Sequence, residues 1–279
     1  MHRVALNKVP LGTDRFSTLG EPVRRVLFGL FLIQFALVWA RLLLPLPLLA
    51  NARWPDGLLL VLAAATTVAA LARRLPGQNV MLASGIIAVI SGGVQCLNSS
   101  SGIPFGPCDF ADNIGQELFH PLRWAVPLLW IVVVLTSRGV ARLMLRPWRK
   151  TRSYGYWVIG VTAALVVLFD LGLEPFATRV KDFWIWHPTK LPFDWYSTPW
   201  VNFVGRGVMA VLILAFATPS LINKKHSKSV SDYHPLILWL LLNGLFATGL
   251  AAKQLWPAVA VIGGGSLVVT VFAVRGARW

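Results

Sequence analysis

The sequence predicts an all-α integral membrane protein, a bundle of about eight transmembrane helices. The first observation is composition: of 279 residues, 56% are hydrophobic and only 13% are charged. The mean hydropathy of +0.64 is too high for a water-soluble domain. The second observation is a series of apolar runs of about 20 residues, a length that crosses a hydrocarbon core of roughly 30 Å. The third is that the sequence has no Walker sequence, dinucleotide-binding glycine fingerprint or His-Glu-x-x-His pair.

The first three apolar runs cover residues 26–50, 57–71 and 79–97. The first is long and lacks a small-residue cleavage site, so we expect a span rather than a removable signal segment. It contains Arg41, which is either a snorkelling side chain or a buried functional cation. The third run is rich in Gly, Ala and Ser, which lets neighbouring helix backbones approach closely.

Five further runs complete the bundle. The fourth is followed by a strongly basic loop that ends at Arg152. The fifth is predicted to end at Glu174, because Pro175 disfavours helical geometry at the residue before it. These five runs are residues 121–136, 154–173, 207–222, 235–250 and 256–274. No internal repeat is visible and the inner loops are short, which favours one transmembrane domain over residues 1–279.

The net charge of +15 is explained by membrane topology better than by nucleic-acid binding. Lys and Arg collect in the cytoplasmic loops of membrane proteins, where they fix orientation and meet anionic lipid. Counting from the N-terminal segment 1–25, alternate segments hold eighteen of the 26 Lys and Arg residues. We therefore expect both termini in the cytoplasm and the chain in a bacterial inner membrane. The loops 98–120 and 175–206 then share the outer side.

Two carboxylates, Asp170 and Glu174, are four residues apart and so lie on one face of a helix. An acid just inside the apolar boundary is costly to ionise, so Asp170 can keep the proton that a general acid needs. Glu174 can hold that proton in place by like-charge repulsion or act as a base toward water. The alternative is a structural role, either a helix–helix hydrogen bond or an ion pair with Arg41 or Arg206.

Aromatic side chains are dense in the segment that follows Glu174. Outer-face Trp and Tyr are expected as an interfacial belt, which accounts for about half of them. The density between residues 183 and 200, in a loop with three prolines, indicates a lid or re-entrant wall over the bundle. Faces of Trp and Phe can stabilise a developing carbocation by cation–π attraction.

The two cysteines, Cys96 and Cys108, are both predicted on the outer side. An oxidising compartment permits a disulfide between them, and two unpaired thiols are the alternative. The five histidines are scattered, and no spacing matches a zinc or di-iron pattern, so we expect no metal.

Several motifs resemble those of the membrane carotenoid 1,2-hydratases, among them the γ-carotene and bisanhydrobacterioruberin hydratases. Residues 101–106, Ser-Gly-Ile-Pro-Phe-Gly, are similar to the Thr-Gly-x-Pro-Phe-Gly loop of that family. Residues 169–175, Phe-Asp-Leu-Gly-Leu-Glu-Pro, resemble its Trp-Asp-Leu-x-Leu-Asp-Pro helix end. Residues 183–186 and 195–205 resemble its downstream aromatic and Asn-Phe elements. The resemblance covers roughly residues 80–225.

The resemblance implies hydration of an acyclic carotenoid or related isoprenoid without a cofactor. An acid protonates the terminal trisubstituted alkene, and water captures the tertiary carbocation. Asp170 is then the acid, Glu174 orients water or tunes Asp170, and Asn202 and Gln95 position water by hydrogen bonds. The aromatic residues expected to contact the substrate are Phe105, Phe183, Trp184, Trp186, Trp195, Tyr196 and Trp200.

One departure from the family pattern is Gln95, at a place where the family usually carries Glu. An amide cannot donate or relay a proton as a carboxyl group does, and Asp109 is a candidate replacement. The alternative function is a non-catalytic protein of the membrane that binds an isoprenoid, quinone or pigment, or a subunit of a membrane complex. A small transporter is disfavoured, because no inverted repeat is apparent. No nucleic-acid partner is expected, and the oligomeric state is left open.

Overall fold

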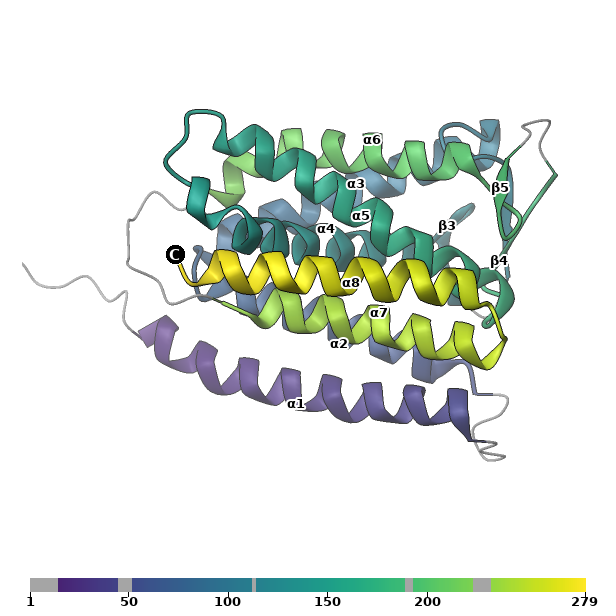
Figure 1. The fold of residues 1–279 in the computed structure, drawn as a ribbon, viewed down its shortest axis with the longest axis horizontal. Helices are drawn as coiled ribbons and strands as arrows, with labels where there is room; N and C mark the ends of the chain where they lie inside the picture. Colours follow the sequence, from purple (N-terminus) through teal and green to yellow (C-terminus); the bar gives the residue numbers. More distant parts are fainter. Residues whose placement is uncertain (1–14, 45–51, 112–113, 189–192, 223–231) are drawn as a thin grey trace, which may run out of the picture.

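The computed structural model describes residues 15–44, 52–111, 114–188, 193–222 and 232–279. Within these residues eight helices are long and apolar enough to cross a membrane, which confirms the predicted fold class. Figure 1 shows them running beside one another along the long axis of the molecule. They are α1 Arg15–Leu43, α2 Trp54–Ala72, α3 Gly77–Ser101, α4 Ala125–Met144, α5 Tyr154–Arg179, α6 Trp200–Ala217, α7 His234–Ala252 and α8 Trp256–Ala277, with short 3-10 turns η3 Arg146–Trp148 and η4 Thr218–Leu221.

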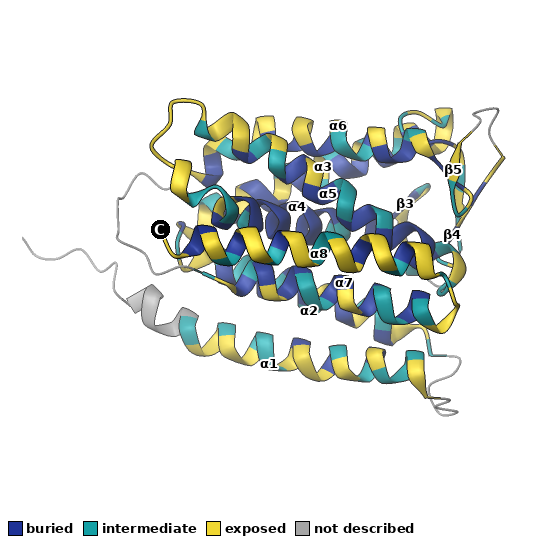
Figure 2. Cartoon of the chain, viewed as in Figure 1, coloured by how far each residue is buried: buried dark blue, intermediate teal, exposed yellow. Residues whose placement is uncertain are grey.

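Helix α4 forms the centre of the bundle. It contacts α2, α3, α5, α7 and α8, and 72% of its most apolar stretch is buried, against 17% for α1 and 22% for α8. Figure 2 shows exposed positions along α1 and α8. Many of them are large apolar residues, such as Ile33 and Leu267. Helices that are apolar on their outer surface as well suit a lipid environment.

In the described part of the chain, three two-stranded antiparallel sheets cover one end of the bundle (Figure 1). Strand β1 Cys108–Phe110 pairs with β4 Trp184–Trp186 and so ties the segment after α3 to the segment after α5. The other pairs are β2 Glu117–Phe119 with β3 Leu122–Arg123, and β5 Asp194–Trp195 with β6 Thr198–Pro199. The start of α1 and the C-terminus both lie at the opposite end of the bundle (Figure 1).

The predicted end of the fifth helix at Glu174 is wrong, because α5 continues through Pro175 to Arg179. Proline has no backbone N–H, so the carbonyl of Leu171 loses its donor within the helix. The indole Nε1 of Trp195 donates to that carbonyl oxygen at 3.0 Å. The helix therefore passes the proline because a side chain from the following loop replaces the missing hydrogen bond.

The predicted start of the sixth helix at residue 207 is also wrong, because α6 begins at Trp200. Pro199 lies just before it in an extended conformation. Asn202 and Arg206 therefore belong to the first two turns of a helix and not to a loop. The absence of a side chain at Gly205 lets α6 pack closely against the loop that follows α3. A Cβ at this position would lie only 2.9 Å from the carbonyl oxygen of Pro104.

The third helix extends four residues beyond its predicted end and stops at Ser101. Gly102 ends it in the left-handed conformation, with φ of 70°. The side chain of Asn98 orders the loop that follows. Its Nδ2 donates to the carbonyl of Gly106 at 3.0 Å, and its Oδ1 accepts from the backbone N–H of Phe105 at 2.8 Å.

Candidate active site

Glu174 is the best-connected carboxylate at the strand-covered end of the bundle, and it is fully buried on α5. Its Oε2 accepts hydrogen bonds from the indole Nε1 of Trp184 at 2.9 Å and of Trp186 at 2.8 Å, and from Thr198 Oγ1 at 3.3 Å. Side chains alternate across a strand, so the two tryptophans of β4 face inward together while Ile185 between them is exposed. The strand pattern Trp-Ile-Trp thus delivers two donors to one oxygen.

Asp170 lies one turn before Glu174, and α6 supplies the partners of both acids. Asn202 Nδ2 donates to Asp170 Oδ2 at 2.9 Å and to Glu174 Oε1 at 3.2 Å. Arg206 reaches Glu174 Oε1 through Nη2 at 3.2 Å. Its Nε is 3.5 Å from Asp170 Oδ1 and donates to Asn202 Oδ1 at 3.3 Å. Two carboxylates, one amide and one guanidinium therefore form a single network.

Arg206 also contacts aromatic faces. Its guanidinium carbon is 5.1 Å from the ring centroid of Phe105 and 5.2 Å from that of Trp130. Such contacts add cation–π attraction to the contacts of Arg206 with the two carboxyl groups. Of the two arginines that the sequence offered as partners for the acids, Arg206 is the one that pairs with them.

Arg41, the other candidate, has a different partner. Its Nη1 is 3.6 Å from Asp56 Oδ2, and its Nη2 donates to the carbonyl of Ala52 at 3.0 Å. Lys181 Nζ is 2.7 Å from the other oxygen of Asp56. These contacts join the ends of α1, α2 and α5, so Arg41 belongs to an ion-pair cluster and not to the network of Asp170.

An apolar cavity of about 120 Å³ lies beside the network. Its walls come mainly from α2, α4, α5 and α7, with Phe110 from β1 and Phe183 from the residues just before β4. Gln95 lines it from α3, and its buried Nε2 has no hydrogen-bond partner among the described residues. Trp184 and Arg206 also line this cavity. Unpaired buried donors are rare in proteins. The Nε2 of Gln95 is therefore available to donate a hydrogen bond to a molecule bound in the cavity.

A second, much smaller cavity of about 10 Å³ lies next to Asp170. Its volume is on the order of one water molecule. Trp130 and Arg206 line it, together with apolar side chains of α4 and α5. Arg206, Leu129 and Leu173 line both cavities and so separate Asp170 from the apolar one.

Most of the residues predicted for the site are brought together. Asp170, Glu174, Asn202, Trp184 and Trp186 share the hydrogen-bond network. Gln95, Phe183 and Trp184 line the apolar cavity. Phe105 is buried beneath the guanidinium of Arg206.

Four predicted residues lie elsewhere. The side chain of Asp109 is 78% exposed, and its Oδ2 is 2.8 Å from Nε2 of His187. Trp195 donates to the backbone of α5, and Tyr196 packs on its ring with centroids 4.9 Å apart. Trp200 is 47% exposed and packs against Phe203.

Three members of the site were not assigned from the sequence: Arg206 as its central cation, Trp130 and Thr198. The four-residue spacing of Asn202 and Arg206 repeats that of Asp170 and Glu174, and this matching spacing was the available signal for Arg206. Trp130 stands inside an ordinary apolar run, which gives no hint of its contact with a guanidinium.

Cys96 and Cys108 are free thiols, not a disulfide. Cys108 lies on β1 near the network. Burial, together with the nearby carboxylate of Glu174, raises the pKa of this thiol to about 12. Among the described residues, no group of three or more His, Cys, Asp or Glu is arranged to hold a metal ion.

The fold and the site define a multi-pass membrane protein with a buried acid–arginine network beside an apolar cavity. The family model of carotenoid biosynthesis proteins matches residues 56–270, and the chain belongs to that family. It is also similar to the bisanhydrobacterioruberin hydratase of Haloarcula japonica, with 28% identity over 138 residues. That match covers 48% of this chain and 44% of the relative, which is less than half the length of either. No solved structure matches.

Proposed function

We propose that the chain is a carotenoid hydratase that adds water to the terminal C1–C2 double bond of an acyclic carotenoid or related isoprenoid, with Asp170 as the acid. Membership of the carotenoid biosynthesis family and similarity to a hydratase support this reaction class. The observation that carries the proposal is the charge balance of the network. Two buried carboxylates, Asp170 and Glu174, face a single guanidinium, that of Arg206.

The charge balance supports a proton on Asp170. Glu174 accepts five hydrogen bonds, as an ionised carboxylate does, and Arg206 neutralises it. A second buried negative charge without a counterion of its own is costly. Asn202 donates to Oδ2 of Asp170, so the proton belongs on Oδ1. The nearby Nε of Arg206 directs its hydrogen to Asn202 and leaves that position available.

The apolar cavity suits the end of a long hydrocarbon. Sites that enclose a whole small molecule usually measure about 300–1,000 Å³, whereas this one measures about 120 Å³. Phe110, Phe183 and Trp184 turn aromatic groups toward it, and aromatic faces stabilise positive charge. Because Arg206, Leu129 and Leu173 line both cavities, movement of these side chains joins the apolar cavity to that of Asp170.

The proposed reaction has two steps. Asp170 transfers its proton to C2 of the terminal double bond, and C1 becomes a tertiary carbocation. A water molecule of the small cavity adds to C1 and returns a proton to the Asp170 carboxylate, which restores the acid. The net change is the addition of one water molecule. Glu174 stays ionised and fixes Asn202 and Arg206. We place the protein in a bacterial inner membrane, with the site toward the outer side.

The test is expression in cells that produce lycopene, followed by chromatography of hydroxylated products. We expect the native chain to form them and Asp170→Asn to lower turnover by about 10²–10⁴-fold, the usual contribution of a general acid. Asp194→Asn is the matched control, because Asp194 is an exposed acid of β5. Full turnover by a folded Asp170→Asn protein would end the proposal.

A second candidate is a non-catalytic membrane protein that binds a quinone or isoprenoid. The unpaired Nε2 of Gln95 favours it, since an amide N–H in an apolar cavity can donate to a carbonyl oxygen. Co-purification of a quinone or unmodified carotenoid, with no conversion in lycopene-producing cells, would support this function over the first.

A further inference from the structure

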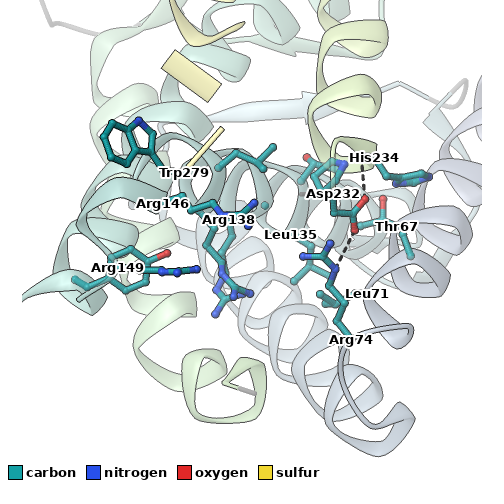
Figure 3. Close-up of a pocket in the computed structure, with 17 residues that line it drawn as sticks. Thr67, Leu71, Arg74, Leu135, Arg138, Arg146, Arg149, Asp232, His234 and Trp279 are labelled. Carbon is teal, nitrogen blue, oxygen red and sulfur yellow. Dashed lines mark hydrogen bonds and ion pairs between the residues drawn. The ribbon is translucent and has the colours of Figure 1, made fainter. Parts of the chain in front are cut away.

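Trp279 lines a cavity of about 580 Å³ (Figure 3). The C-terminus lies at the end of the bundle opposite the strands (Figure 1), so the cavity is at that end. Residues of α2, α4 and α7 form most of its wall, with Tyr154 at the start of α5 and Trp279 at the C-terminus. It is distant in the fold from the network of Asp170 and Glu174, and the proposed hydration does not use it.

Five arginines and one acid are the charged residues that line this cavity. The arginines are Arg74, Arg138, Arg142, Arg146 and Arg149, and the acid is Asp232. Arg138, Arg142 and Arg146 follow one another at intervals of four, so the first two lie on one face of α4. Like charges at this spacing repel one another and destabilise a helix. A bound anion would remove that repulsion.

Arg138 is the most deeply placed of the five, with only 7% of its surface exposed. Its Nη2 donates to the carbonyl of Leu221 at 3.1 Å. Its Nε is buried and has no hydrogen-bond partner among the described residues. A charged group buried with an unused donor is costly unless a partner arrives. Arg138 therefore points to a ligand that accepts hydrogen bonds.

The single acid is already engaged. Asp232 Oδ2 is 3.4 Å from Nε of Arg74, and Asp232 Oδ1 accepts from the backbone N–H of His234 at 3.1 Å (Figure 3). Burial lowers the pKa of Arg74 below its ordinary value, and the nearby charge of Arg142 acts in the same direction, against the attraction of Asp232. Asp232, the one acidic side chain among the described residues that line the cavity, is therefore already bound to Arg74 and to the backbone of His234.

The helices around the cavity pack closely at two glycines. A Cβ at Gly139 of α4 would lie 2.4 Å from Cβ of Pro235 at the start of α7. A Cβ at Gly276 of α8 would lie 2.2 Å from the carbonyl oxygen of Leu143 on α4. These glycines fix α4 against α7 and α8, so the arginines of α4 are presented by a rigid frame.

We propose that this arginine-lined cavity binds a phosphate group, carried by an anionic lipid headgroup or by a soluble phosphate or diphosphate. Guanidinium groups match phosphate oxygens with paired N–H donors. Basic pockets between transmembrane helices are known places for anionic headgroups. Leu71, Leu135 and Leu143 line the same cavity, so it can also hold the first carbons attached to a headgroup.

The test is thermal unfolding of the full-length protein in a neutral detergent, followed by intrinsic tryptophan fluorescence. The probes are phosphatidylglycerol, phosphatidylcholine, inorganic pyrophosphate, and sodium chloride at matched ionic strength. The test variant is Arg142→Gln/Arg149→Gln, since both side chains line the cavity and both residues are exposed. The control variant is Lys150→Gln/Arg152→Gln, which removes two exposed charges that lie in the loop of Arg149 but do not line the cavity.

A rise in Tm with phosphatidylglycerol but not with pyrophosphate identifies a lipid headgroup, and the reverse identifies a soluble phosphate. In either case we expect the test variant to need about tenfold more ligand for the same rise, because it loses charge-assisted hydrogen bonds. The control variant should match the native chain. If neither phosphatidylglycerol nor pyrophosphate raises the Tm more than phosphatidylcholine and sodium chloride do, the proposal is overturned. The proposal is also overturned if the ligand-induced rise in Tm falls equally in both variants, or if it does not fall in the test variant.

Discussion

Asp170 and Glu174 carry the same functional group one turn apart, yet they have different surroundings. Both oxygens of Glu174 are occupied by donors, including two indoles and a guanidinium. Asp170 accepts one hydrogen bond, from Asn202, and lines a cavity of about the volume of one water molecule. Under the proposed function, this difference gives Glu174 the role of holding the site together and Asp170 that of the acid.

We expect Glu174→Gln to lower the free energy of unfolding by about 3 kcal/mol, because it removes the buried counterion of Arg206 and turns an amide N–H toward other donors. Asp170→Asn should lower it by about 1 kcal/mol or less, since Asn can still accept from Asn202. Unfolding in detergent, followed by tryptophan fluorescence, measures both changes. Equal losses in the two variants would contradict the different roles.

Two buried amides of α3 provide a second comparison. Gln95 has an unpaired Nε2, whereas Asn98 makes two hydrogen bonds to the loop that follows the helix. We expect Gln95→Met to stabilise the empty protein by about 1 kcal/mol, because it removes a buried group without a partner. Asn98→Leu should destabilise it by about 2 kcal/mol, because it leaves two backbone groups unpaired. Loss of stability in Gln95→Met would show that the amide is satisfied in the folded chain.

At the scale of elements, α5 depends on a contact from outside the helix. Trp195 supplies the hydrogen bond that Pro175 withholds from the carbonyl of Leu171. Trp195→Phe should therefore cost about 1–2 kcal/mol of unfolding free energy. In a Pro175→Ala background, where the helix supplies its own donor, the same change should cost clearly less. A double-mutant cycle measures the difference. Additive effects would mean that the indole does not replace the missing donor.

The same helix shows how far the sequence could predict the fold. Hydropathy placed eight spans, because the bilayer requires long apolar runs. It misplaced helix ends, because those depend on distant partners: Trp195 for α5, and the fit of Gly205 against Pro104 for the start of α6. The two- and three-residue strands follow from pairing between loops and leave no periodic signal of their own.

The candidate site was predictable to a similar degree. The acids stood out because carboxylates are rare in apolar helices. Their partner Arg206 was one of two arginines that the sequence could not tell apart. The sequence predicted that the tryptophans of β4 contact the substrate through their aromatic faces. Their role as N–H donors to Glu174 depends on both side chains pointing into the bundle, which the sequence does not indicate. Local composition therefore found the buried acids but not the network that orders them.

At the scale of the whole molecule, the excess of Lys and Arg predicts that the end holding the start of α1 and the C-terminus faces the cytoplasm. A chain with Cys96→Ser and Cys108→Ser allows a test with single new cysteines at exposed positions, Phe193→Cys among the strands and Lys150→Cys at the opposite end. A membrane-impermeant maleimide should label Phe193→Cys in intact cells and Lys150→Cys only after lysis. The opposite pattern would invert the topology.

The small volume of the apolar cavity has a consequence for how a long polyene would be processed. A space of about 120 Å³ admits one tip of such a molecule, so the remainder must stay among the acyl chains of the bilayer. A carotenoid with two identical tips must then leave and return reversed before its second half reacts. Under the proposed activity, the singly hydroxylated compound would accumulate first, and the diol would follow only as the starting pigment runs out.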